Sequence, residues 1–434
     1  MIENIKNILS NIKELDEWKI VENKISSREL FFIRQELDMN RGKEVIKYIV
    51  TVYKDFEEDG EKYRGSSTVQ VHPTMTKEEI KNSIEGAVFA ASFVKNEYYP
   101  INEGKYLEEV KIESNFDNDT MSNYLPKISK CLFEEDVYEK GCVNSSELFL
   151  NKVYIRIVNS KGLDVSYSGY SGMLDLVTNW KEESEEIEVS RNIEFTEYDG
   201  EMIKNEIRDM LKLSQEKAIA KPTPDLKTST IILSGEPVKE FLKYYYINAN
   251  GKQIYDGIST YRAGECVQGQ EVIGEKVNLL LDPKLENSTY SAPYDEDGVY
   301  LKKTQIIEDG VLKRYWGDMR HSYYLGIEPT GNIKNFIVKS GSKSIEEMKA
   351  SPYIELVSFS DFQMDTMTGD FGGEIRLGWY FDGENTVSIT GGSISGNIKE
   401  VEKEMYFSSE TQKLNNFLGP KTIELSNVSL AGIE

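Results

Sequence analysis

Apolar residues in the first hundred positions follow helical spacing in two places and strand-like alternation in three others. At the start of the second helical stretch, Thr76 is a suitable cap, followed by Glu78 and Glu79 in the first turn. Gly-containing and acidic turns separate the strands. The expected helices are Met1–Trp18 and Met75–Asn96, the expected strands Ser27–Arg34, Glu44–Asp55 and Gly65–Val71, and the expected turns Asn40–Gly42 and Phe56–Gly60.

The next stretch of the chain begins with a polar, turn-rich segment, Tyr98–Asn118, which indicates a boundary near residue 100. After it, two strands bracket the turn Asn159–Gly162, where Gly162 suits a positive φ angle. A strand with an acidic outer face and a helix complete this part. The expected elements are helix Met121–Tyr138, strands Ser145–Val158, Leu163–Ser168 and Glu185–Thr196, and helix Glu201–Ala220.

The pattern changes after Lys221–Ser229, which contains two prolines and is the best linker candidate. A short strand, Thr230–Ser234, then leads into a helix that Pro237 can begin. Short strands and glycine turns dominate the rest. The sequence therefore predicts an α+β protein with a mixed α/β N-terminal module at 1–100, a middle module at 101–220, a linker at 221–229 and a β-rich domain at 230–434.

The balance of charge excludes one large class of partners. The chain has 74 acidic and 51 basic residues, a formal net charge of −23. This field repels phosphate backbones, so we expect no nucleic-acid partner. No apolar run reaches the ~18 residues of a membrane span, so no membrane partner is expected either. Three cysteines, an odd number, favour free thiols in a reducing compartment and a cytoplasmic location.

Histidine is scarce, because His72 and His321 are the only two in the chain. A zinc peptidase site needs at least two His or Cys ligands and a third donor, usually with two of them on one helical face. No such spacing exists here, so we expect no metal site. Catalysis by a serine or cysteine with a histidine would have to use one of these two residues, and we assign no catalytic residue.

An ordered set of short motifs gives the chain its resemblance to a known family. The motifs are Leu281-Asp282-Pro283, Tyr294–Val299, Ile307–Leu312, Thr330–Asn332, Met367–Phe371, Ile394–Ile398 and Ser429–Gly432, with the Asn159–Gly162 turn upstream. Each motif is weak alone, whereas their order and spacing are specific. The chain resembles the TldD/PmbA family, whose members have been described as modulators of DNA gyrase and as peptidases of peptide maturation.

The resemblance also distinguishes between two branches of that family. In the TldD branch, the helix after the Gly/Pro turn carries HExxxH, which binds zinc. The corresponding helix here, Pro237–Ile247, has no histidine in any register. The chain therefore resembles the PmbA (TldE) branch, which implies a metal-free subunit without a cofactor of its own. The implied partner is a TldD-like zinc peptidase subunit in a heterodimer, with a homodimer left open.

The resemblance also suggests where a peptide substrate would lie. Family loops that match Thr330-Gly331-Asn332 and Thr368-Gly369-Asp370 border the groove for the substrate chain, and glycine allows close backbone approach. Turn formation alone is the alternative. Arg320 and His321 precede the first loop and could bind a carboxylate, or could simply be surface residues. For Asp295–Gly298 we favour a hairpin turn over a cation site.

Three hypotheses for function follow. The first is a metal-free subunit of a TldD/TldE-type metallopeptidase that acts on unstructured peptides. The second is a hydrolase that uses carboxylates such as Asp365 and Asp370. The third is a homodimeric peptide-binding scaffold without a peptidase partner. The sequence identifies neither the substrate nor the partner.

Overall fold

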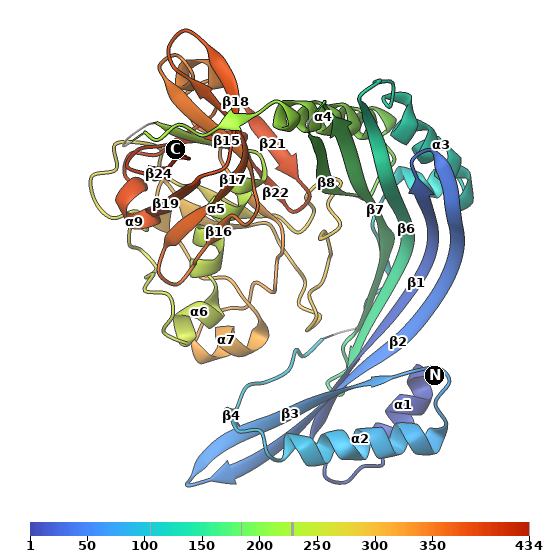
Figure 1. Cartoon of the computed structure of the whole chain (residues 1–434). Coiled ribbons are helices and arrows are strands. Elements are labelled where there is room, and N and C mark those ends of the chain that lie inside the picture. The colour runs from blue at the N-terminus through green and yellow to red at the C-terminus, as the bar shows by residue number, and fades with distance from the viewer. Residues whose placement is uncertain (105, 184, 227–229, 434) are drawn as a thin grey trace.

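The computed structural model describes residues 1–104, 106–183, 185–226 and 230–433. Within these residues, the N-terminal half forms one long, arched sheet and the C-terminal half forms a β-rich domain on the concave side of the arch (Figure 1). The expected α+β class is confirmed. No described helix is long and apolar enough to span a membrane.

The N-terminal sheet is almost entirely antiparallel. Its strand order is β4-β3-β2-β1-β6-β7-β5, with β8 added beside β7. The strands are β1 (Glu17–Ile33), β2 (Glu36–Glu58), β3 (Glu61–Val71), β4 (Asn96–Glu97), β5 (Val110–Lys111), β6 (Gly141–Asn159), β7 (Asp164–Lys181) and β8 (Glu186–Phe195). The helices are α1 (Ile2–Leu9), α2 (Lys77–Ala91), α3 (Met121–Glu134) and α4 (Gly200–Ala218), with a short 3₁₀ turn at Asn115–Asn118.

Two separate hydrophobic cores cover the two ends of this sheet. At one end, α1 and α2 pack on Ile20, Val50 and Val52. At the other end, α3 and α4 pack on residues such as Leu148 and Leu174. Strand β1 runs through both cores and pairs with β6, so the modules predicted at 1–100 and 101–220 share one continuous sheet.

Several predicted boundaries are wrong. The first helix ends at Leu9, and Trp18 already belongs to β1. The turn predicted at Asn40–Gly42 lies inside β2, because the chain reverses at Arg34 and Gln35 instead. Arg34 takes a φ of 54°, a conformation that sequence rules assign to glycine or asparagine. By contrast, the Thr76 cap is confirmed, since Thr76 and Glu79 form a reciprocal capping box.

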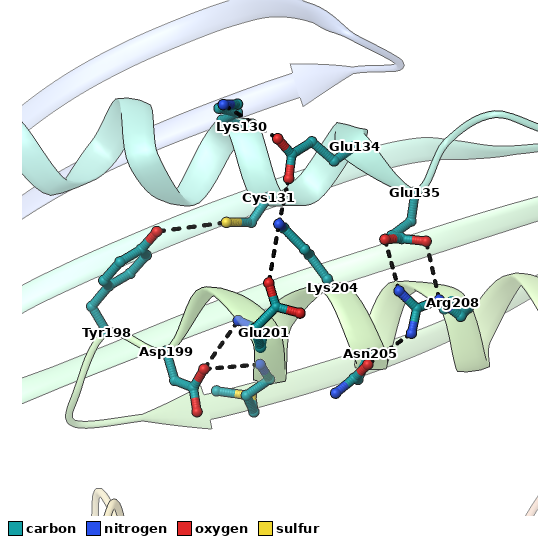
Figure 2. A network of polar contacts seen from close by, with 11 residues as sticks. Lys130, Cys131, Glu134, Glu135, Tyr198, Asp199, Glu201, Lys204, Asn205 and Arg208 are labelled. Carbon is teal, nitrogen blue, oxygen red and sulfur yellow. Dashed lines mark hydrogen bonds and ion pairs between the residues drawn. The ribbon is translucent and has the colours of Figure 1, made fainter.

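Helices α3 and α4 lie side by side and are joined by polar contacts (Figure 2). The Lys204 ammonium group lies 2.6 Å from the Glu134 carboxylate, and the Arg208 guanidinium group lies 2.8 Å from the Glu135 carboxylate. Asp199 caps α4 by accepting bonds from two backbone amides of the first turn. Such exposed ion pairs contribute little stability, so the apolar face of each helix determines the packing.

The C-terminal domain contains two sheets. The larger has ten strands in the order β20-β23-β10-β15-β17-β18-β9 with β16, β19 and β24 attached, and the smaller is β13-β12-β11-β14-β22-β21. The elements of the larger sheet are β9 (Lys221–Pro222), β10 (Ile231–Ser234), β15 (Tyr353–Phe359), β16 (Gln363–Met364), β17 (Asp370–Phe381), β18 (Thr386–Thr390), β19 (Ser393–Asn397), β20 (Tyr406–Phe407), β23 (Thr422–Leu425) and β24 (Ser429–Ala431). Those of the smaller sheet are β11 (Leu279–Leu281), β12 (Thr304–Glu308), β13 (Val311–Leu312), β14 (Phe336–Val338), β21 (Thr411–Leu414) and β22 (Phe417–Pro420).

One core joins these sheets to the longest helix of the C-terminal domain, α5 (Glu236–Asn248). The shorter helices are α6 (Gly251–Tyr255), α7 (Met319–Tyr324), α8 (Ile345–Met348) and α9 (Ile398–Val401). The predicted linker at 221–229 starts as β9, which pairs with β18 of the large sheet, and its residues 227–229 lie outside the described part of the chain.

Candidate functional site

Helix α5 is the element on which a metal motif would lie, and its local sequence explains its position. Gly235 has a φ of 75° and Pro237 lies in the first turn, so the chain turns sharply out of β10 and starts the helix at once. Val238, Phe241 and Tyr245 are fully buried against the two sheets. This packing fixes one face of α5.

The tyrosines of α5 are tightly packed. The Tyr245 hydroxyl donates a hydrogen bond of 2.9 Å to Glu402, and both side chains are buried. Burial raises the pKa of Glu402 and raises that of Tyr245 well above its usual value. Tyr246 stacks on Trp316 with 4.4 Å between ring centroids and on Phe336 with 5.1 Å. These side chains serve as packing and hydrogen-bonding groups.

The donor set around α5 does not fit a zinc ion. Zinc sites in proteins use histidine, thiolate and carboxylate ligands, usually four in a tetrahedral arrangement. Here α5 offers three consecutive tyrosines near its C-terminal end and no histidine or cysteine. Across the described residues, no group of three or more His, Cys, Asp or Glu side chains is placed to hold a metal.

The loop Thr330–Asn332 is held by a buried carboxylate, Asp295. Asp295 Oδ2 accepts a 3.1 Å bond from the Asn332 amide, and Oδ1 accepts bonds of 2.9 Å from the amides of Asp297 and Val299. Burial, reinforced by the Asp297 carboxylate, raises the pKa of Asp295 to about 6. Gly331 has a φ of 73°, and a Cβ atom there would lie 2.4 Å from Leu301. The predicted Asp295–Gly298 turn is therefore also the support of the loop.

Arg320 and His321 lie on α7, next to the same loop. The Gly317 amide just before α7 donates a 3.0 Å bond to Thr330 Oγ1. His321 is buried, and its Nδ1 lies 2.9 Å from Asp318 Oδ2. Arg320 donates a 2.8 Å bond to Asn96 Oδ1 of β4, so it joins the C-terminal domain to the N-terminal sheet.

The loop Thr368–Asp370 is formed by a separate turn between β16 and β17. Asp365 Oδ1 accepts bonds from the amides of Met367 and Thr368, and these bonds lower the pKa of the Asp365 carboxyl. Asn397 donates a 2.8 Å bond to Asp370 Oδ1 and a 3.1 Å bond to the Thr368 carbonyl. Both carboxylates therefore shape the turn. Both are exposed, and the bonds to Asp365 favour its charged form, whereas a carboxyl group that acts as a general acid needs a raised pKa.

The C-terminal end of α5 contacts both loop regions. The Tyr246 hydroxyl donates a 3.0 Å bond to the Ile333 carbonyl, directly after the first loop. The Asn248 amide group donates a 2.8 Å bond to the Thr366 carbonyl, directly before Met367. The structure thus connects the segment before α7 to Thr330 through Gly317, holds Thr368–Asp370 in a separate turn, and links the two loop regions through α5.

Sequence reasoning missed the residues that position these loops. Asp295, Tyr246, Asn248 and Asn397 carry no local signal for this role, since each bonds a partner that is distant in the sequence. The Tyr294–Val299 motif did draw attention to Asp295, but only as part of a turn.

The C-terminal half of the chain is similar to a known protein family. Residues 227–432 match the family model described as the PmbA/TldA metallopeptidase C-terminal domain. An uncharacterised protein of Methanocaldococcus jannaschii is 26% identical over 285 residues, which cover 62% of this chain and 65% of that protein. The protein described as metalloprotease PmbA homolog of Buchnera aphidicola is 25% identical over 319 residues, which cover 70% of this chain and 68% of that protein. The chain thus spans about two thirds of the length of each of these relatives.

A structural comparison extends the similarity to the N-terminal half. The crystal structure of TldE from Thermococcus kodakarensis has a TM-score of 0.79, with 18% sequence identity, and covers 99% of this chain and 100% of that chain. At this identity the similarity establishes a shared fold. It includes the long arched sheet as well as the domain that matches the family model.

Proposed function

Because the chain belongs to the TldD/PmbA family, we propose that it is the metal-free subunit of a TldD/TldE-type metallopeptidase that cleaves unstructured peptides. In this proposal a TldD-like partner carries the zinc, and this chain forms part of the wall around the substrate. The observation that carries the proposal is the composition of α5: the helix bonds to residues that flank both candidate loops, yet it has tyrosines and no histidine.

The candidate loops would contact the peptide mainly through backbone and short polar groups. The proposed set is Arg320, His321, Thr330, Gly331, Asn332, Thr368, Gly369 and Asp370. Backbone contacts to an extended peptide do not depend on its side chains, which suits a peptidase of unfolded segments. The three cysteines are free thiols, and this supports the further proposal of a cytoplasmic location.

The test uses the full chain and the HExxxH-bearing relative from the same organism. We expect a stable complex in size-exclusion chromatography, peptide cleavage by the mixture that chelators abolish, and no cleavage by this chain alone. Asn332→Ala and Asp370→Ala should lower cleavage by the complex more than they lower its stability. Asn82→Ala, on the exposed side of α2, is a matched control that should leave cleavage unchanged.

Other outcomes would favour the other hypotheses. Cleavage by the pure chain in the presence of a chelator would support the carboxylate hydrolase. Absence of a complex with the relative, together with peptide binding by a homodimer, would support the scaffold. If the two loop variants change only the thermal midpoint, the assignment of the loops is wrong while the family assignment is unaffected.

A further inference from the structure

One edge of the arched sheet is open. Strand β2 pairs with β1 over Glu36–Tyr53, but β3 covers only Tyr48–Glu58 on its other side. Residues 36–47 have no strand on that side within the described parts of the chain, a length of ~40 Å at about 3.4 Å per residue. Residues 36–44 are exposed on both faces of the sheet. Figure 1 shows this part of β2 as the outermost strand, beside α3.

The β2–β3 turn determines which backbone groups point outward. This turn consists of Asp59 and Gly60, with φ values of 54° and 86°, as in a two-residue type I′ hairpin. Its closing pair, Glu58 and Glu61, therefore exchanges backbone hydrogen bonds. It follows that the backbone N–H and C=O groups of even-numbered residues of β2 point toward β3. In agreement, the carbonyl of the odd-numbered Tyr53 accepts a hydrogen bond from the backbone amide of Asp16, just before β1. Beyond β3, the residues that direct their N–H and C=O groups outward are Asn40, Gly42, Glu44 and Ile46.

The side chains along this open edge are basic on one face. Arg41, Lys43 and Lys47 are odd-numbered and point to the same side, in a chain with a net charge of −23. Arg41 pairs with Glu29 of β1. Lys43 and Lys47 form no ion pair with any described residue within 4 Å. The edge therefore favours an incoming strand with acidic side chains at alternate positions.

A second copy of the same chain fits this edge poorly in the registers centred on residues 41–43. When two copies of this edge pair as antiparallel strands about a two-fold axis, odd-numbered residues lie opposite odd-numbered residues and even-numbered residues opposite even-numbered ones. When the two-fold axis passes through Gly42, Arg41 of each copy lies opposite Lys43 of the other. When the axis passes through Arg41 or through Lys43, the residue on the axis lies opposite the same residue of the second copy. Odd residues form the non-hydrogen-bonded pairs, where side chains are closest, so like charges there are destabilising.

We propose that the open edge of β2 receives a preformed strand from a non-identical protein, and that this strand carries acidic residues at alternate positions. A preformed strand is favoured over a free peptide because fixing a backbone costs about 1–2 kcal/mol per residue. An edge exposed on both faces offers little side-chain burial to offset that cost. The inference rests on the proposed function, since the occupant would be the zinc-bearing subunit.

The first measurement is the affinity for the HExxxH-bearing relative of the same organism, by sedimentation at low and high salt. Lys43→Glu should weaken the complex at least ~10-fold at low salt, an ion-pair loss plus repulsion of about 1.4 kcal/mol or more. Lys212→Glu, an equal charge change on the exposed side of α4, should have no effect. Asn40→Pro, which removes one outward N–H and leaves the bonds to β1, should also weaken the complex.

The second measurement needs no partner. In the register centred on Gly42, Lys43→Glu places the new carboxylate of each copy opposite Arg41 of the other, so this variant should self-associate more than the wild type. If the wild-type complex forms and the edge variants bind as tightly as wild type, the inference is overturned and the proposed function stands. If no wild-type complex forms, the proposed function fails, and the self-association of the variants then tests the open edge. Stronger self-association of Lys43→Glu than of Lys212→Glu would support the open edge as a strand-binding site. Equal self-association of the two variants would overturn it.

Discussion

Replacing Asp295 by asparagine should change how stability depends on pH. Asp295 is only 5% exposed and accepts three backbone hydrogen bonds, one of them from the Asn332 loop. Its pKa rises from 3.8 to about 6 in the folded protein. The folded state therefore binds this proton more tightly than the unfolded state. The carboxyl contributes most to stability below pH 3.8, and that contribution is lost as the pH rises through about 6.

The size of the change in stability follows from the shift in the pKa of Asp295. A difference of about 2.2 pH units corresponds to ~3 kcal/mol, of which ~2 kcal/mol falls between about pH 4.5 and pH 7.5. Asparagine can keep the bonds from Asp297 and Val299 through its carbonyl oxygen, but its amide group faces the Asn332 N–H. This mismatch costs about 1–3 kcal/mol at every pH. The pH-dependent part of the difference therefore isolates the charge.

The assay is urea unfolding of both proteins across this pH range. The stability of Asp295→Asn relative to wild type should rise by ~2 kcal/mol from about pH 4.5 to pH 7.5. The other acidic groups of the chain titrate in both proteins and cancel in the comparison. A difference that stays constant with pH would show that the buried carboxyl does not have a raised pKa, and the reasoning would be refuted.

Two further predictions concern α5. The purified chain should contain far less than one equivalent of zinc or iron by elemental analysis, because α5 lacks histidine and cysteine; near-equimolar metal that resists mild chelation would contradict this. Tyr245→Phe should lower the free energy of unfolding by about 1–3 kcal/mol, because Oε2 of the buried Glu402 carboxyl loses its hydrogen bond while Oε1 keeps the bond from Lys399. Tyr323→Phe, an exposed tyrosine on α7, is the control, and equal effects of the two variants would show that the buried bond contributes nothing.

Local signals in the sequence predicted the elements that depend on local contacts. The Thr76 cap and the apolar spacing after it identified α2, and Gly162 has the positive φ that its turn requires. The β1–β2 turn was misplaced because Gly42 is a conventional turn residue, whereas the chain reverses at Arg34. The reversal depends on the pairing of β1 with β2 over its full length, which no short window of sequence contains.

In the candidate site, too, the sequence predicted the features that depend on local signals and not those that depend on distant contacts. The motifs located the loops Thr330–Asn332 and Thr368–Asp370, since glycine turns have a local signature. The groups that hold the loops were not predictable, because Asp295 and Asn397 act across separations of 37 and 27 residues. Arg320 was selected as a residue that could bind a carboxylate, which stays a prediction, and its bond to Asn96 of β4 could not be read from the local sequence.

The pairing of β1 with β6 affects how the protein folds during synthesis. Ile33 pairs with Ser145 and Lys19 with Asn159, so one side of β1 has no neighbour until the ribosome has made more than a hundred further residues. At about 5–20 residues per second this delay lasts roughly 5–25 s. During that time Leu30 and Phe32 of β1, which α3 and α4 later cover, are exposed on a strand whose β6 side is unpaired. We therefore expect chaperones to bind the nascent chain before it folds.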